Sequence, residues 1–179
     1  SIVNCQTSAG SERVGFFDSG IGGISVAREF LKLRPGADIF YIADWDYCPY
    51  GDKDHNIVLE RAHTLTRKLL EKDCKLIVVA CNTATAVAID SLRATYNVQF
   101  VGMEPAVKPA ALHSKTGVIG IIATANTFHG RLFRETSARF AANANIIPAV
   151  GEGFVELVEN GELNTTKAHE VVAKVVEPL

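Results

Sequence analysis

A cysteine lies where a predicted buried strand passes into a predicted helix. The apolar residues 76–80 (LIVVA) precede Cys81, and residues 83–96 have a pattern typical of a helix. A thiol at a helix N-terminus meets unpaired backbone N–H groups and the positive end of the helix dipole, and both favour the reactive thiolate. A lone cysteine is more often a small buried apolar residue. The polar residues after Cys81 lead us to expect a cysteine that transfers protons.

A carboxylate lies at a second junction of this kind. Residues 14–18 predict a short buried strand, and residues 18–23 (DSGIGG) predict a glycine-rich turn before a helix. The spacing is not that of a dinucleotide-binding GxGxxG motif, and an acidic residue there would repel a pyrophosphate. Asp18 would either cap the helix or act as an acid/base group beside the hydroxyl of Ser19. Because Asp18 and Cys81 stand at similar junctions, we expect Asp18 to assist proton transfer by Cys81.

Polar side chains near other strand ends are candidates for holding a substrate carboxylate. Hydroxyl, amide and phenol groups donate hydrogen bonds, and a glycine lets a ligand approach the backbone closely. At a helix start, hydroxyl and amide groups serve equally well as caps. The candidate binding residues are Ser19, Tyr50, Gly51, Asn82, Thr83, Thr124 and Thr127.

Predicted strands and helices alternate along the chain, which indicates an α/β fold with parallel sheets. We expect residues 1–12 to be a flexible tail, residues 13–103 a first α/β lobe and residues 104–179 a second, incomplete α/β lobe. Ligands bind outside the carboxyl ends of the strands in such sheets. The expected strands are residues 14–18, 38–43, 76–80, 98–102, 117–123 and 145–149, and the expected helices are residues 24–32, 56–72, 83–96, 131–142, 153–160 and 165–176.

The composition argues against several classes of partner. The net charge is −2 without a basic stripe, so we expect no nucleic acid partner, because phosphate binding needs clustered Lys and Arg. No apolar run is long enough to span a membrane, and the N-terminus has no signal-peptide pattern. The four cysteines and five histidines show no zinc-type spacing, so we expect no metal. Few cysteines for this length indicate free thiols in a reducing, cytoplasmic compartment.

The ordered set of motifs resembles the glutamate racemases of the aspartate/glutamate racemase superfamily. The set runs from Val14 almost to the end of the chain. Each motif is short, but their order is specific. The matching stretches are VGFFDSGIGGISV, PYGDK, LIVVACNTATAVA, VGMEPAVKPA, GVIGIIAT and FVELVENG.

The resemblance implies two similar lobes with an active site between them, and cofactor-independent interconversion of L- and D-glutamate. The D-glutamate would supply bacterial peptidoglycan synthesis, and family members are often homodimers. Such enzymes place one cysteine on each face of the α-carbon. By resemblance, Cys81 is the first of these and Asp18 assists it. The residues that the resemblance implies for substrate binding are Ser19, Tyr50, Gly51, Asn82, Thr83, Thr127 and, less directly, Thr124.

One part of the family pattern is missing from the sequence. The second cysteine normally lies in a GCTH-like segment after the helix that corresponds to residues 165–176, and no cysteine follows Cys81 here. We therefore expect the 179 residues alone not to racemise by the two-base route, and a longer parent protein to do so. Two alternatives stay open: a one-cysteine decarboxylase or isomerase of the superfamily, and a non-catalytic ligand-binding module.

Overall fold

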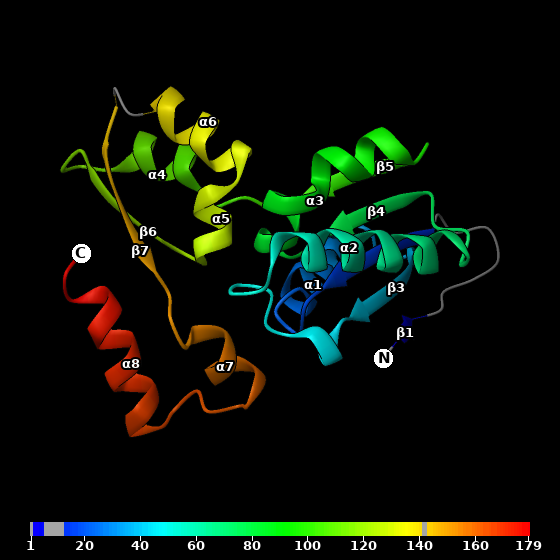
Figure 1. Ribbon diagram of the computed structural model, residues 1–179, viewed down its shortest axis with the longest axis horizontal. Coiled ribbons are helices and arrows are strands. Elements are labelled where there is room, and N and C mark those ends of the chain that lie inside the picture. The colour runs from blue at the N-terminus through cyan, green and yellow to red at the C-terminus, as the bar shows by residue number, and fades with distance from the viewer. Residues whose placement is uncertain (1, 6–12, 141–142) are drawn as a thin grey trace. The chain divides into compact units, whose positions relative to one another are not determined.

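A computed structural model describes residues 2–5, 13–140 and 143–179 of the chain. The chain divides into two compact units, Ser1–Met103 and Glu104–Leu179. Each contains parallel strands and flanking helices, so the expected α/β class is confirmed (Figure 1). In the described part of the chain, no helix combines the length and the apolar character needed to cross a bilayer.

The first unit is built on a five-stranded sheet of order β1-β3-β2-β4-β5. Strands β3, β2, β4 and β5 run parallel to one another, and β1 pairs with β3 in antiparallel register. The strands are β1 (Ile2–Cys5), β2 (Arg13–Asp18), β3 (Asp38–Ala43), β4 (Leu76–Val79) and β5 (Gln99–Gly102). All but the first residue of β2 are buried, as expected for a central strand covered on both faces.

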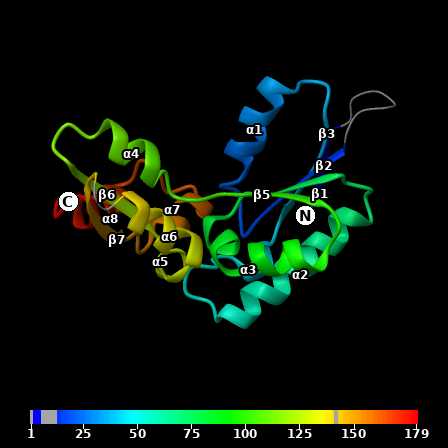
Figure 2. The same cartoon turned by 90° about the horizontal axis from the view of Figure 1, so that it is seen from above.

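Helices cover both faces of this sheet. Figure 2 shows α1 (Ile24–Leu33) on one face, and α2 (His55–Leu70) and α3 (Asn82–Thr95) on the other. Side chains alternate accordingly: Phe16 packs on the α1 face, and a Cβ at Gly15 would lie 2.8 Å from Leu69 of α2. A one-turn helix, η1 (Trp45–Tyr47), follows β3.

The strand order brings the ends of β2 and β4 together. From β2 the chain crosses to β3 on one side, and it then returns past β2 to β4 on the other side. The crevice at such a reversal is the usual ligand site of an open parallel sheet. Backbone hydrogen bonds continue past the strand ends, from Asp44 N–H to the Asp18 carbonyl (3.0 Å) and from Ala80 N–H to the Phe17 carbonyl (2.9 Å). The segments that leave β2, β3 and β4 therefore start side by side.

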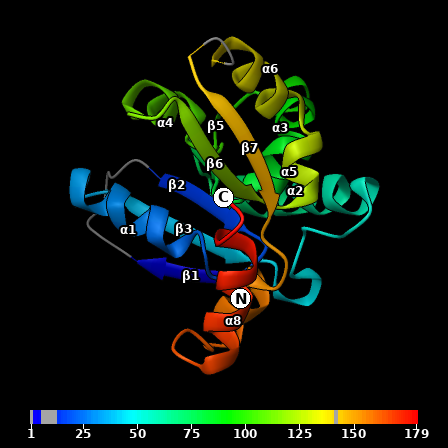
Figure 3. The same cartoon turned by 90° about the vertical axis from the view of Figure 1, so that its left-hand side faces the viewer.

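The second unit contains the parallel pair β6 (Val118–Ala123) and β7 (Asn145–Val150), which lie side by side in Figure 3. One face of β6 presents Ile119 and Ile121 to a core that includes Val107 and Ala111. These two residues come from α4, so this helix covers that face of the pair. The helices are α4 (Val107–His113), α5 (Ala125–His129), α6 (Arg131–Phe140), α7 (Phe154–Glu159) and α8 (Thr166–Val176).

The structure differs from the sequence predictions in a few elements. Residues 2–5 form β1 and so contradict the flexible tail expected there, while the rest of that tail, residues 1 and 6–12, lies outside the described residues. Ile2 and Val3 are strand-forming residues, and β3 offers an edge with which they pair. Helices α4 and α5 and the turn η1 were not expected, because each is too short to show a clear helical period.

Candidate active site

Cys81 lies one residue beyond the end of β4, after Ala80, and caps the N-terminus of α3. Its backbone is extended, and its sulfur accepts the N–H of Ala84 at 3.4 Å. The sulfur also lies 3.9 Å from Ser19 Oγ, towards which its S–H group is oriented as donor. Only 7% of the residue is exposed, so the thiol sits in a nearly dry environment at the edge of the sheet.

The protonation state of Cys81 differs from the expectation. Burial raises the pKa of the Cys81 thiol to about 12, and the negative charge of Asp18 adds to this rise. Hydrogen bonds from Ala84 and Ser19 lower the pKa but do not outweigh burial. The expected thiolate is therefore wrong for the resting structure, because removal of water outweighs the helix N-terminus. Near neutral pH, Cys81 is a thiol that holds a proton.

Asp18 is held rigidly by the glycine-rich turn that follows β2. Its carboxylate accepts the N–H of Ser19 at 2.7 Å and the N–H of Gly23 at 2.6 Å. The Ser19 hydroxyl, 3.4 Å from Asp18 Oδ1, lies within reach of both the carboxylate and the Cys81 sulfur. The structure thus brings together Asp18, Ser19 and Cys81 in a continuous chain along which a proton can pass.

Glycine is required at position 23 for this turn to form. A Cβ at Gly23 would lie 2.7 Å from the Cβ of Ala80 and 3.0 Å from the Cβ of Asp18. Real Cβ atoms do not approach so closely, so any side chain would push the turn away from the end of β4. The DSGIGG spacing therefore follows from close packing beside Cys81.

Asp44, which was not selected from the sequence, organises the loop after β3. It is 5% exposed, and Arg61 of α2 donates to both of its oxygens, from Nε at 2.9 Å and from Nη2 at 2.6 Å. The Tyr50 hydroxyl donates to the same carboxylate at 2.5 Å. The guanidinium of Arg61 also stacks over the Tyr47 ring, 4.1 Å from its centroid. The signal was the position of Asp44, directly after a predicted strand.

The Tyr50 hydroxyl has a different partner from the one expected. We expected it to donate to a ligand carboxylate, but it donates its single proton to the Asp44 carboxylate in a hydrogen bond. Burial raises the pKa of Tyr50 above its ordinary value, and the Asp44 bond and the charge of a Cys81 thiolate raise it further. The phenol thus stays protonated and buried, and the neighbouring Gly51 is buried as well.

The remaining predicted residues belong to the two different units. Asn82 is exposed and Thr83 is buried, both in the first turn of α3. Thr124 and Thr127 belong to the second unit, where Thr124 caps α5 by accepting the Thr127 N–H at 3.3 Å. Their two hydroxyl oxygens lie 3.0 Å apart, and Thr127 is 1% exposed.

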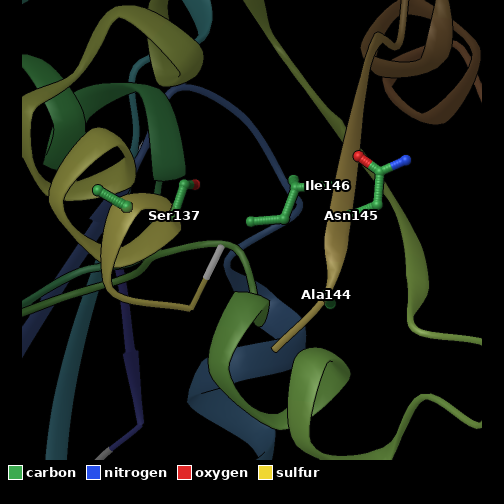
Figure 4. A pocket seen from close by; sticks show the side chains of 5 residues that line it. Ser137, Ala144, Asn145 and Ile146 are labelled. Atoms are coloured by element: carbon green, nitrogen blue, oxygen red, sulfur yellow. The ribbon is translucent and has the colours of Figure 1, made fainter. Parts of the chain in front are cut away.

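Metal-ligating side chains and an open pocket in the second unit add no further candidate to this set. Among residues 2–5, 13–140 and 143–179, no three His, Cys, Asp or Glu side chains gather as a metal site. The second unit has an open pocket of about 470 Å³ between α6 and β7. Figure 4 shows Ile146 projecting from β7 towards the helix that carries Ser137, while Asn145 projects from the other side of the strand. The pocket lining is uncharged, with both polar and apolar side chains, and it contains none of the predicted site residues.

Comparisons with known proteins agree on one family. Residues 34–179 match the family model described as Asp/Glu/Hydantoin racemase. The chain is 46% identical to the glutamate racemase of Herpetosiphon aurantiacus over 93% of its own length and 65% of the relative's. It is 43% identical to the glutamate racemase of Ectopseudomonas mendocina over 93% of its own length and 64% of that protein's. The chain therefore spans just under two thirds of these curated relatives.

Solved structures give the same result. The glutamate racemase of Escherichia coli, in complex with L-glutamate and the activator UDP-MurNAc-ala, superposes with a TM-score of 0.85 at 33% identity. The match covers 94% of this chain and 64% of that one. The isoform RacE1 from Bacillus anthracis superposes with a TM-score of 0.83 at 27% identity, covering 93% of this chain and 63% of that chain.

Proposed function

Because this chain belongs to the Asp/Glu/Hydantoin racemase family, we propose that the protein interconverts L- and D-glutamate by proton transfer at the α-carbon, without a cofactor. The relatives named as glutamate racemases, and the L-glutamate bound to the similar Escherichia coli enzyme, support glutamate as the substrate. The chain spans under two thirds of those relatives, so the proposal concerns the full-length protein.

The hydrogen-bonded chain from Cys81 through Ser19 to Asp18 is the observation on which this proposal rests. It places a thiol, a hydroxyl and a carboxylate at the reversal point of the sheet, where a ligand is expected. An amino-acid α-proton is weakly acidic, so the base that removes it must be close, dry and correctly oriented. The Cys81 thiol meets the first two conditions, because it is buried beside the strand ends.

The proton balance gives each of the three residues a role. When Cys81 acts as base, its thiol proton passes through the Ser19 hydroxyl to the Asp18 carboxylate, which becomes a carboxylic acid. The thiolate then takes the α-proton, and the C–H electron pair stays on the α-carbon, delocalised into the substrate carboxylate. When Cys81 acts as acid, the resting thiol donates its proton to that carbanion. The raised pKa of Cys81 suits the second role directly.

Inversion also requires an acid or base on the opposite face of the α-carbon. We assign that role to a second cysteine, as the family resemblance implies. These 179 residues contain no cysteine after Cys81, and they span 65% of the Herpetosiphon aurantiacus relative. For the substrate carboxylate we propose donors from the first unit, Gly51, Asn82 and Thr83. For the second unit we propose Thr124 and Thr127 as substrate-binding residues in their own right. We further propose that the D-glutamate formed supplies peptidoglycan synthesis in the cytoplasm.

Exchange of the glutamate α-proton in deuterated water tests this function. The full-length protein is incubated with L-glutamate and separately with D-glutamate, and deuterium incorporation and inversion are followed by NMR and circular dichroism. We expect both in the wild type and neither in Cys81→Ala, whose fold is checked by its melting temperature. Full activity in Cys81→Ala would contradict the assignment of Cys81 as the group that transfers the α-proton. Glutamate binding without exchange in the wild type would indicate a non-catalytic binding module instead.

A further inference from the structure

The loop between β3 and α2 is fastened to the sheet and to the helix through one carboxylate. Asp44 continues the β2–β3 ladder with its backbone N–H, which bonds the Asp18 carbonyl at 3.0 Å. Its side chain accepts two hydrogen bonds from Arg61 and one from Tyr50. Both oxygens of this buried carboxylate thus accept hydrogen bonds. The backbone bond to the Asp18 carbonyl attaches Asp44 directly to the end of β2.

Further contacts constrain the loop along most of its length. The Asp44 carbonyl accepts the Tyr47 N–H at 2.9 Å, and the Tyr50 carbonyl accepts the Lys53 N–H at 3.3 Å. Arg61 holds the loop a second time through the Tyr47 ring. Tyr50 is 1% exposed, so its ring packs inside the protein, and the next residue, Gly51, is buried as well.

Net stability alone is a weak explanation for such an arrangement. Removing a carboxylate and a guanidinium from water costs free energy that their attraction often does not repay. A bidentate guanidinium–carboxylate pair does fix geometry, because both groups are planar and their two bonds are parallel. A geometric role is therefore the better reading of Asp44 and Arg61.

We propose that Asp44 and Arg61 are positioning residues that hold the Tyr50–Gly51 loop beside Cys81, so that the loop meets the substrate carboxylate. This inference rests on the proposed racemase function. The loop also lies near the thiol, because Tyr50 is close enough to feel the charge of a Cys81 thiolate. Loss of the Asp44 carboxylate would release the loop while leaving the sheet and the cysteine in place.

Peptide-resolved alkylation tests the positioning role without requiring activity. Asp44→Asn and Arg61→Met are compared with Asp46→Asn, a matched change of an exposed acid in the same loop. The rates at which iodoacetamide modifies Cys81 and Cys74 are measured by mass spectrometry. Cys74 is 2% exposed in the same unit, so it reports any general loosening of the fold. We expect Cys81 to react about tenfold faster in the two variants, equivalent to about 1.4 kcal/mol of local opening, while Cys74 keeps its wild-type rate.

Kinetics of the full-length protein supply the second readout. We expect Asp44→Asn to raise KM for glutamate about tenfold with a smaller change in kcat, because the loop binds substrate rather than transferring the proton. Arg61→Lys should raise KM less than Arg61→Met does, since lysine keeps the positive charge but not the bidentate geometry. Asp46→Asn should leave both constants unchanged.

Three outcomes separate the possibilities. Wild-type Cys81 alkylation together with wild-type KM in Asp44→Asn would overturn the positioning role. Equal acceleration of Cys81 and Cys74 would overturn it too, because it would show a purely structural effect. If the wild type itself does not exchange the glutamate α-proton, the proposed function fails, and the alkylation rates alone then decide whether Asp44 and Arg61 hold the loop.

Discussion

Cys81 Sγ lies 3.9 Å from Ser19 Oγ, although 62 positions separate the two residues in the chain. The proximity arises because Cys81 follows β4, Ser19 follows β2, and these strands are direct neighbours in the sheet. The two groups around the sulfur act in opposite directions. The Asp18 charge raises the pKa of Cys81, whereas hydrogen bonds from Ser19 lower it.

Asp18→Asn should make Cys81 more reactive as a nucleophile and less effective in catalysis. Removal of the carboxylate charge lowers the Cys81 pKa, so more thiolate exists at pH 8 and alkylation accelerates by about threefold to tenfold. Proton transfer should fall at the same time, because the final acceptor of the thiol proton is lost. Alkylation rates and deuterium exchange are measured on the same preparation, and a parallel fall of both would contradict the proposed role.

Ser19→Ala should shift the reactivity of Cys81 in the opposite direction. Loss of the Ser19 hydroxyl, whose hydrogen bond lowers the Cys81 pKa, leaves the thiol harder to ionise, so alkylation at pH 8 should slow by about twofold to fivefold. Across pH 7–10 the wild-type rate should keep rising without a plateau, because burial raises the Cys81 pKa to about 12. A plateau near pH 8 in the wild type would show that the thiol is less desolvated than the structure indicates.

Gly23→Ala should disturb the turn that holds Asp18. The new Cβ would meet Ala80 Cβ at 2.7 Å, so the turn must shift, at a cost of about 1–3 kcal/mol. Gly36→Ala is the matched control, because a Cβ there has no atom within 4 Å. Urea denaturation should show a lower midpoint for Gly23→Ala alone. Equal midpoints for the two variants would mean that the turn tolerates a side chain.

His63 should make the first unit sensitive to acid. It lies between α2 and α3, with its ring nitrogens 3.2 Å from Tyr96 Oη and 2.9 Å from Ser91 Oγ, and with Arg67 nearby. Burial lowers the His63 pKa, and the positive charge of Arg67 lowers it further. The folded state therefore binds fewer protons than the unfolded state, so stability is complete above pH 6.5 and declines as pH falls through the depressed folded pKa.

Replacing His63 by a residue that does not titrate tests this pH dependence. His63→Gln should lose less stability than the wild type between pH 7 and pH 5, as measured by urea midpoints. His55→Gln, a change of an exposed histidine on the same helix, should follow the wild-type profile. Identical pH profiles for wild type and His63→Gln would assign the acid sensitivity to other groups.

Local patterns were enough to place the two main candidate residues. The buried run before Asp18 and the run before Cys81 have the length and composition of parallel strands, and a glycine-rich turn or a helix pattern follows each. Strand ends are set by residues adjacent in sequence, so their positions can be read without knowing the fold. The same holds for Asp44, whose position after a strand was visible although its partners were not.

The sequence by itself therefore determined the alternation of strands and helices, and it determined that Asp18 and Cys81 stand at strand ends. Only the tertiary structure decided that β2 and β4 are neighbours, that Arg61 reaches Asp44 across 17 positions, and that Cys81 rests as a buried thiol. Strand order, long-range pairing and burial depend on contacts between distant segments, whereas strand and helix patterns are written in the spacing of near neighbours.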